Sequence, residues 1–448
     1  MSITQYDIPM AYLHAKPSTR KVAKAPKSHR MLDKDGNEMY LEICRNLYGD
    51  VEAAKLFYEH NAKFLLSLGF QQCDEDPCIY FNEERTCYIC VYIDDILVAA
   101  SDDHTRTKIE DALTKKYKIK KEGDISWYLG ISYERKGNKI MATQTSKIER
   151  LLETCNLQDC ANATTPISET SPVDVRKLPN IDDTETLKKL QDAHPHMDLP
   201  SITGALLNLA HHTRPDILVA TSKLARWISR PTNQIYTMAK QILRFLKATK
   251  YDGIEINAHG HKGMEVHVDS SHISERTIHG LSRYGYHISI GGSPIRSRTK
   301  FHTYAKLSTP AAEYDAICEA VKDARRYNDV YCQLNKIAHS TIAARIIFHS
   351  DCQPAIKAAT TDKPGCIYAD PEENRQRRIL PIKNDKHIDV KYFKITDLQH
   401  RKLIDIRYKT GADQEADFLT KYTFSTPEFT RKRKFFVKDS RFFGAQRG

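Results

Sequence analysis

Two adjacent carboxylates, Asp94 and Asp95, stand between two runs of residues that are typical of β-strands. The runs cover residues 87–93 and 96–100, so the pair is predicted to occupy the turn of a β-hairpin. Adjacent carboxylates repel one another, and a bound cation offsets that repulsion. Because both flanking strands are apolar, the hairpin should be buried, which favours a metal site over a solvated Asp-Asp turn.

Four further acids lie at the ends of predicted elements in the second half of the chain. Asp269 ends a strand, Glu313 opens a helix, Asp351 follows another strand and Asp417 lies in a late helical segment. Such ends can converge on one edge of a mixed sheet. Any one of these acids alone is more often structural, so it is their combination that indicates a second acidic site.

The elements that must position these acids follow from hydrophobic periodicity and from turn residues. Proline disfavours helix for the residue before it, so Arg214-Pro215 and Arg230-Pro231 should split the helical stretch 201–250. The predicted elements are a helix within 39–70, an extended segment at 127–133, a helix at 144–158, strands at 264–268 and 285–290, a helix at 311–334, a strand at 344–349 and short strands near 388–407.

Composition limits the class of protein. The chain has 448 residues, enough for several domains with cores of their own, and a formal net charge of +11, which suits a polyanionic partner. Eleven cysteines without a framework spacing favour reduced thiols in an intracellular protein. We expect a soluble protein without a membrane partner, because no apolar stretch approaches the length of a bilayer span.

Several long motifs, in the same order along the chain, resemble copia-type (Pseudoviridae) LTR retrotransposon Pol polyproteins. The segment 91–98 resembles the YxDD motif of reverse transcriptases. Further matching segments lie at 5–13, 47–49, 68–70, 127–131, 213–216 and 242–249, and in the second half at 308–314, 350–356, 386–390 and 416–421. The resemblance covers nearly the whole chain and implies its reverse transcriptase and ribonuclease H (RNase H) portion.

The resemblance implies a polymerase site in the first half. Asp7 would join Asp94 and Asp95 in holding two Mg²⁺ ions, or Mn²⁺, with one activating the primer 3′-hydroxyl and one gripping the triphosphate. Tyr12 matches the steric gate that excludes a ribose 2′-hydroxyl, whereas Glu52 stands where the family has glutamine. The predicted substrate-binding residues are Tyr12, Glu52, Tyr92, Trp127, Gly130, Arg296 and Arg298.

For the second half, the resemblance implies RNase H chemistry, in which four acids surround two magnesium ions. The resemblance assigns this catalytic role to Asp269, Glu313, Asp351 and Asp417. All four are also expected metal ligands. Arg296, Arg298 and Lys300 precede the predicted helix that contains Glu313, and they are candidates for contact with backbone phosphates of the hybrid. A solvated basic strand is an equally good interpretation of these three residues.

The expected fold class is α+β, with a partial reverse transcriptase palm, a helical thumb and connection, and an α/β RNase H-like mixed-sheet domain. The expected divisions are a palm at 1–165 that lacks the fingers, a linker at 166–200, the thumb and connection at 201–260, the RNase H-like domain at 261–425 and a basic tail at 426–448. The tail is expected to be a solvated amphipathic end.

The resemblance also implies the partners and the location. Expected partners are an RNA template, a DNA primer, an RNA/DNA hybrid and dNTPs, together with the integrase and capsid parts of the same polyprotein. The expected location is the cytoplasm, in virus-like particles, with the nucleus as a second location. Two other interpretations remain open: a degenerate or domesticated fragment that binds nucleic acid without catalysis, and a zinc module built on Cys73, Cys78, Cys87 and Cys90.

Overall fold

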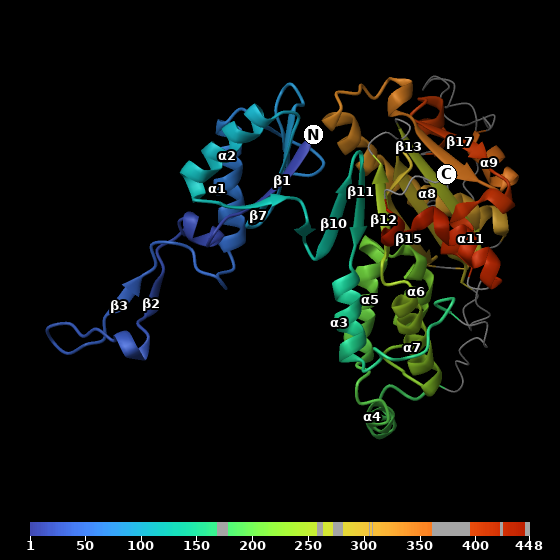
Figure 1. The fold of residues 1–448 in the computed structure, drawn as a ribbon, viewed down its shortest axis with the longest axis horizontal. Coiled ribbons are helices and arrows are strands. Elements are labelled where there is room, and N and C mark those ends of the chain that lie inside the picture. Colours follow the sequence, from blue (N-terminus) through green and yellow to red (C-terminus); the bar gives the residue numbers. More distant parts are fainter. Residues whose placement is uncertain are drawn as a thin grey trace, which may run out of the picture. The chain divides into compact units, whose positions relative to one another are not determined.

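The computed structural model of the chain (Figure 1) divides into two compact units. Unit 1 comprises Met1–Tyr128 and Asp329–Lys336, and unit 2 comprises Leu129–Asn328 and Ile337–Gly448. The structure describes residues 1–167, 178–257, 263–271, 281–303, 305–306, 308–360, 395–421 and 424–443. Both units combine helices with β-sheets, so the predicted α+β class is confirmed.

Unit 1 is built on a six-stranded sheet in the order β4-β5-β6-β7-β1-β8. Alternate residues of its strands face a core that includes Tyr6 and Ile96, which pair across β1 and β7. Helices α1 (Ala53–Ser67) and α2 (Asp103–Tyr117) supply the other side of this core. The strands are β1 (Ser2–Asp7), β4 (Gln71–Gln72), β5 (Ile79–Phe81), β6 (Cys87–Tyr92), β7 (Asp95–Ala100) and β8 (Lys120–Asp124).

The predicted hairpin is present, but its turn is shifted by one residue. Strand β6 ends at Tyr92 and β7 begins at Asp95, with Tyr92 and Asp95 paired. The turn is therefore formed by Ile93 and Asp94, and Ile93 has a φ of 56°. Asp95 is the first residue of β7 and not part of the turn, because it pairs with Tyr92 across the hairpin.

The helix predicted within residues 39–70 is shorter than expected. Residues Tyr40–Glu42 form strand β3, which pairs with β2 (Val22–Lys24), and only Ala53–Ser67 are helical. Gly69, with a φ of 88°, follows the helix as predicted. The extended segment predicted at 127–133 is also interrupted, since β9 (Trp127–Tyr128) ends before Leu129 and Gly130, which both have positive φ.

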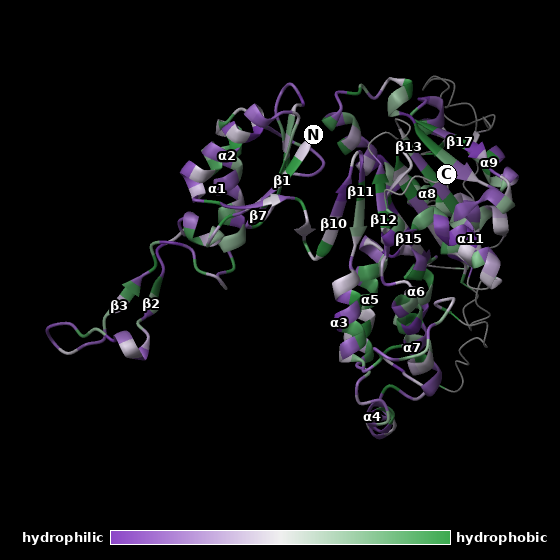
Figure 2. Cartoon of the chain, viewed as in Figure 1, coloured by the Kyte–Doolittle hydropathy of each residue, from purple (hydrophilic) through white to green (hydrophobic). Residues whose placement is uncertain are grey.

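The helical part of unit 2 packs around one apolar core. The two Arg-Pro pairs separate its helices as predicted, because each lies between consecutive helices. Its helices are α3 (Thr145–Thr154), α5 (Leu199–His212), α6 (Leu218–Ala225) and α7 (Asn233–Ala248). The helix α4 (Thr184–Asp192) lies within the predicted linker and is mainly hydrophilic in Figure 2, whereas α5 is largely hydrophobic.

Strands join this helical part to the rest of unit 2. The hairpin β10 (Ile131–Lys136) and β11 (Lys139–Thr143) continues into β12 (Asp252–Asn257) and β18 (Lys438–Asp439). Residues 129–165, which were assigned to the palm, thus group with unit 2 in this structure. The other predicted domain boundaries remain predictions.

A mixed five-stranded sheet forms the other part of unit 2, in the order β15-β14-β13-β16-β17. Strands β13 to β15 pair antiparallel, whereas β16 and β17 run parallel to β13. Helix α8 (Thr309–Leu334) and helix α9 (Gln353–Thr360) share an apolar core with this sheet. The strands are β13 (Met264–Ser271), β14 (Arg283–Ile290), β15 (Ser293–Phe301), β16 (Ile346–Ser350) and β17 (Ile404–Tyr408).

The described residues of the basic tail are amphipathic, as expected, but one face of the segment is buried and not solvated. Residues Thr426–Phe436 form helix α11, and Phe429 and Phe436 are buried in the helical core. Lys432 and Arg433 point inward, because acids of unit 2 pair with both of them. In the part of the chain that the structure describes, no helix combines the length and the hydropathy of a membrane span.

Candidate active sites

The mixed sheet of unit 2 presents two of the predicted acids at the ends of neighbouring strands. Asp269 lies near the end of β13, and Asp351 directly follows β16. The two strands are parallel, with His267 opposite His349. Residues two positions further along each strand therefore emerge at the same edge of the sheet, since side chains alternate along a strand.

A close approach of two chain segments brings Asp417 to this edge. Asp269 pairs with Gly285 of β14, and the short helix η8 (Glu415–Leu419) packs over that glycine. A Cβ atom at position 285 would lie 2.5 Å from Cβ of Leu419 and 2.9 Å from its carbonyl oxygen. Glycine at 285 thus lets η8 approach the sheet, and Asp417 lies within η8.

The carboxylates of Asp269, Asp351 and Asp417 form a cluster. One oxygen of each lies within 4.8 Å of one oxygen of both others. Glu313, near the start of α8, accepts a hydrogen bond from the backbone N–H of Ser270 through Oε1, at 2.9 Å. Its Oε2 is buried and has no hydrogen-bond partner among the described residues. All four acids that were predicted from the sequence thus surround one region of unit 2.

Burial and mutual repulsion raise the pKa values of Asp269, Glu313 and Asp351. Burial is the main cause for Asp269 and for Glu313, and the neighbouring carboxylates raise the pKa of each further. Burial also raises the pKa of Asp351, with an added contribution from Asp417. These pKa shifts mean that the cluster is destabilised when all its members are ionised without a cation.

Three polar side chains that we did not predict as site residues contact the cluster. Lys421 Nζ lies 2.6 Å from Oδ1 of Asp417, and Lys432 Nζ lies 3.4 Å from Oδ2 of the same residue. The hydroxyl of Thr420 donates a hydrogen bond to Asp269. Thr420 and Lys421 lie in the matching motif at 416–421, but membership of a motif does not reveal these contacts. Lys432 belongs to the basic tail, which was expected to be solvated.

The donor set suits a hard divalent cation. Carboxylate oxygens are the preferred ligands of Mg²⁺ and Mn²⁺. A cation would offset the repulsion among the acids and would give the unpaired Oε2 of Glu313 a partner, either directly or through a water molecule. The residues present therefore fit the metal that the resemblance implies.

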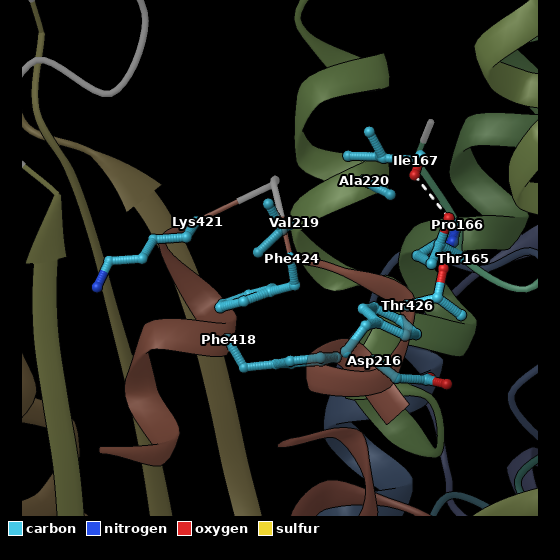
Figure 3. Close-up of a pocket in the computed structure, with 11 residues that line it drawn as sticks. Thr165, Pro166, Ile167, Asp216, Val219, Ala220, Phe418, Lys421, Phe424 and Thr426 are labelled. Carbon is cyan, nitrogen blue, oxygen red and sulfur yellow. Dashed lines mark hydrogen bonds between the residues drawn. The ribbon is translucent and has the colours of Figure 1, made fainter. Parts of the chain in front are cut away.

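A pocket of about 340 Å³ adjoins this site within unit 2 (Figure 3). Lys421 lines it, and the rings of Phe418 and Phe424 are stacked with their centroids 6.1 Å apart. Asp216 lies at another part of its wall. The remaining lining residues are Thr165, Pro166, Ile167, Val219, Ala220, Thr426 and Phe429.

The acids predicted for a polymerase site come from β1 and from the hairpin of unit 1. Asp7 is paired with Asp95 across β1 and β7, and the backbone N–H of Ile8 donates to the carbonyl oxygen of Asp94 at 2.8 Å. Burial raises the pKa of Asp7, and Asp94 raises it further. Burial is also the main cause of the raised pKa of Asp95. The three acids are thus neighbours, but they do not form a group as tight as the unit 2 cluster.

Two tyrosines lie beside these acids. The rings of Tyr12 and Tyr48 are in contact, with centroids 4.8 Å apart. Burial raises the pKa of Tyr48, and the charge of Asp94 adds to this effect. Tyr12 was predicted as a site residue, whereas Tyr48 had been noted only as part of a family motif. Their contact could not be derived from sequence, since 36 positions separate them.

Glu52 is held by residues of the segment that follows Tyr12. Ser18 donates a hydrogen bond to Glu52 Oε2 at 2.7 Å, and Lys21 Nζ lies 3.3 Å from the same oxygen. The hydrogen bond from Ser18 lowers the pKa of Glu52, so this group is a carboxylate at neutral pH. Tyr92 and Trp127 are exposed, as suits residues that contact a substrate.

The remaining predicted substrate-binding residues lie in unit 2. Gly130 has a φ of 78°, and its carbonyl oxygen accepts a hydrogen bond from Gln144 at 3.3 Å. Arg298 pairs with Asp323 of α8 at 3.1 Å, so part of its hydrogen-bonding capacity is used within the protein. Nε of Arg296 is buried without a hydrogen-bond partner in the structure. The motif at 386–390 lies outside the described residues.

Comparison with known proteins gives related sequences over most of the chain. Residues 1–169 match a family model described as "Reverse transcriptase (RNA-dependent DNA polymerase)". The chain is 24% identical over 432 residues to the retrovirus-related Pol polyprotein from transposon TNT 1-94 of Nicotiana tabacum, which covers 94% of this chain and 30% of that polyprotein. It is 25% identical over 364 residues to the Pol polyprotein from transposon RE1 of Arabidopsis thaliana, covering 78% of this chain and 24% of that one.

The chain thus spans less than a third of the length of these curated relatives. Among solved structures, a foamy viral protease-reverse transcriptase in complex with RNA/DNA hybrid matches with a TM-score of 0.47 and 12% identity. That match covers 92% of this chain and 44% of the viral chain, and a likeness at this level adds nothing to the fold described above.

Proposed function

We propose that this homologue of copia-type LTR retrotransposon Pol polyproteins cleaves the RNA strand of RNA/DNA hybrids at the acidic cluster of unit 2. Residues 1–169 match the reverse transcriptase family model, and the alignment with the TNT 1-94 Pol polyprotein covers 94% of the chain. The observation that carries the proposal is the group of carboxylates from Asp269, Asp351 and Asp417 within 4.8 Å of one another.

In the proposed reaction, each side chain has a distinct role. Asp269, Asp351 and Asp417 would hold two divalent cations, and Glu313 would complete the site through its unpaired Oε2. The bound cations would supply an activated water molecule and would offset the charge on the leaving 3′-oxygen. Lys421 limits the repulsion among the carboxylates until the cations bind, because its ammonium group lies beside Asp417.

A cleavage assay with the purified chain tests this proposal. We expect Mg²⁺-dependent cleavage of a labelled RNA strand in an RNA/DNA hybrid, with little cleavage of the same RNA alone. Binding of the hybrid without any cleavage, in Mg²⁺ or Mn²⁺, would instead support the alternative of a fragment that binds nucleic acid and has lost catalysis.

RNA-directed DNA synthesis is the second candidate function, and it rests on unit 1. Asp7 is opposite Asp95 in the sheet, with Asp94 in the adjoining turn and Tyr12 nearby in sequence. This arrangement supports a site for dNTPs, an RNA template and a DNA primer. Primer extension with Mg²⁺ tests it, and the absence of incorporation by the chain alone would restrict the proposal to hybrid cleavage.

A further inference from the structure

A second group of possible metal ligands lies on the same sheet as the acidic cluster. Glu265 and His267 precede Asp269 on β13 at alternate positions, and His349 precedes Asp351 by two residues on β16. Side chains two residues apart on a strand face the same side, at a spacing of about 6.6 Å. His267 and His349 are paired across the two strands. One ligand atom of each of the three residues lies within 4.8 Å of the other two.

Two ring nitrogen atoms of this group lack a well-directed hydrogen bond. The imidazole rings of His267 and His349 are stacked, with centroids 4.7 Å apart and an interplanar angle of 15°. Among the described residues, no group meets hydrogen-bond geometry with Nδ1 of His267 or with Nε2 of His349, although a carboxylate lies close to each. His267 is only 3% exposed, so bulk water does not hydrate its ring.

Carboxylates lie next to both rings. Glu265 Oε2 is 3.6 Å from Nε2 of His349, and Glu415 Oε2 is 3.0 Å from Nδ1 of His267. The second separation is a close contact of a carboxylate oxygen with a ring nitrogen, so Glu415 balances Nδ1 of His267 electrostatically. Glu415 is itself held by Lys409, whose Nζ lies 2.6 Å from Glu415 Oε2.

We propose that Glu265, His267 and His349 bind a divalent transition metal ion, Zn²⁺, at a site separate from the acidic cluster. Two imidazoles and one carboxylate are a ligand set that zinc uses in proteins, with water in the fourth position. Imidazole nitrogen selects Zn²⁺ over Mg²⁺, which prefers oxygen ligands. Glu265 and His349 are partly exposed, which gives the ion a path from solvent.

Glu415, which lies beside Nδ1 of His267, would support this ion indirectly and leave Nε2 of that ring to bind it. Carboxylates beside a metal-bound histidine fix the orientation of its ring and strengthen its binding. The ion would tie β13 to β16 directly behind Asp269 and Asp351, so it would stabilise the strand ends that present these acids. This role differs from cleavage, because none of the three proposed zinc ligands belongs to the acidic cluster.

Zinc titration of the full chain tests the proposal. The chain is purified, stripped of metal with a chelator and titrated with Zn²⁺ against a chromophoric competitor. We expect one tight site, and a loss of affinity of more than about 10-fold in His349→Gln and in Glu265→Gln. His104→Gln, which changes an exposed histidine of α2, is the matched control and should bind as the wild type does.

Two further measurements separate this site from other metal-binding groups of the chain. Asp351→Asn should retain zinc binding, and excess Mg²⁺ should not displace the zinc. With Co²⁺ in place of Zn²⁺, the absorption spectrum should lack the charge-transfer band of a thiolate ligand. The proposal is overturned if Glu265→Gln and His349→Gln fold and bind zinc as the wild type does, or if the cobalt spectrum shows thiolate ligation.

Glu265 is 46% exposed at its side chain, so Glu265→Gln should fold even if His349→Gln does not. Circular dichroism and thermal unfolding without metal establish whether each variant is folded. A folded Glu265→Gln chain with unchanged zinc affinity, together with wild-type chain that gains no thermal stability from zinc, contradicts the proposal without any measurement of cleavage.

Discussion

Lys421 Nζ lies 2.6 Å from Oδ1 of Asp417, so the acidic cluster of unit 2 contains its own counter-charge. The same lysine lowers the pKa of Asp351, against the larger effect of burial, which raises it. A cation bound by the carboxylates must therefore compete with an ammonium group, because both are attracted to the same oxygen atoms.

Replacing this lysine should change how the chain responds to Mg²⁺. In Lys421→Met, the cluster loses a positive charge, and we expect Mg²⁺ to bind up to about tenfold more tightly, equivalent to ~1.4 kcal/mol. The increase in melting temperature caused by Mg²⁺ measures this effect. Lys357→Met, at an exposed position of α9, is the control. Weaker binding of Mg²⁺ in Lys421→Met would show that the lysine does not oppose the cation.

The stability of the metal-free chain should fall as the pH rises above about 7. Burial raises the pKa of Glu313 above its ordinary value, so the folded chain holds a proton that the unfolded chain has released. By linkage, the free energy that this retained proton contributes to folding is fully present below the pKa of the carboxyl in the unfolded chain. It is lost as the pH rises through the pKa of the carboxyl in the folded chain. Buried His267 and His287 have lowered pKa values and act in the opposite direction, but only below the ordinary histidine pKa of about 6.5.

Urea unfolding between about pH 7 and pH 9, with and without Mg²⁺, measures this loss. We expect Mg²⁺ to reduce the slope, because a cation stabilises the ionised carboxylates. Glu313→Gln should also reduce it in the metal-free chain, since the group that titrates is gone. A slope that is the same in wild type and Glu313→Gln would contradict the assignment.

The sequence allowed the acids of the unit 2 cluster to be selected, but not their surroundings. Asp269 ends a predicted strand, Asp351 follows one and Asp417 lies in a matching motif, and the structure places the three together. Contacts between distant segments, such as Gly285 with Leu419, could not be derived, because they depend on tertiary packing.

Local sequence patterns predicted the helix boundaries correctly where the backbone chemistry of proline determines them. The Arg-Pro pairs separate α5, α6 and α7, since proline imposes its restriction in any context. The prediction for the basic segment that contains α11 was less accurate, because a high density of charge indicates a solvated helix unless acidic partners elsewhere in the chain are known. Here Arg433 meets Asp216 and Asp252, which lie far away in the sequence.

That buried ion pair network should be important for the stability of unit 2. Asp216 is fully buried, and the charges of Arg214 and Arg433 lower its pKa to about 2 although burial alone would raise it. Asp216→Ala leaves the buried guanidinium group of Arg214 without a carboxylate, whereas Arg433 retains Asp252, and this should cost about 3–5 kcal/mol of unfolding free energy. Urea unfolding measures the loss, and Asp182→Ala, an exposed aspartate, is the control. A loss below about 1 kcal/mol would contradict this role.

Glu52 should limit any DNA synthesis by unit 1. Its carboxylate is ionised and adds to that of Asp50 beside Lys21, so the local charge around this lysine is negative. We expect Glu52→Gln to lower the KM for dNTPs by up to about tenfold in primer extension, since a negative charge is removed. Glu59→Gln, on an exposed part of α1, is the control. If Asp94→Asn extends primers as well as wild type, the incorporation does not come from this site.

Hybrid cleavage by Asp351→Asn compared with wild type tests the central claim most directly. Asp351 is partly exposed, so the variant should fold, and it removes one carboxylate from the group that would hold the cations. We expect wild type to cleave the RNA strand with Mg²⁺, and Asp351→Asn to lose at least about 100-fold in rate, or ~2.7 kcal/mol. Asp405→Asn, on β17 of the same sheet, should retain wild-type cleavage. Equal cleavage by wild type and Asp351→Asn, or no cleavage by a folded wild type, would contradict the claim.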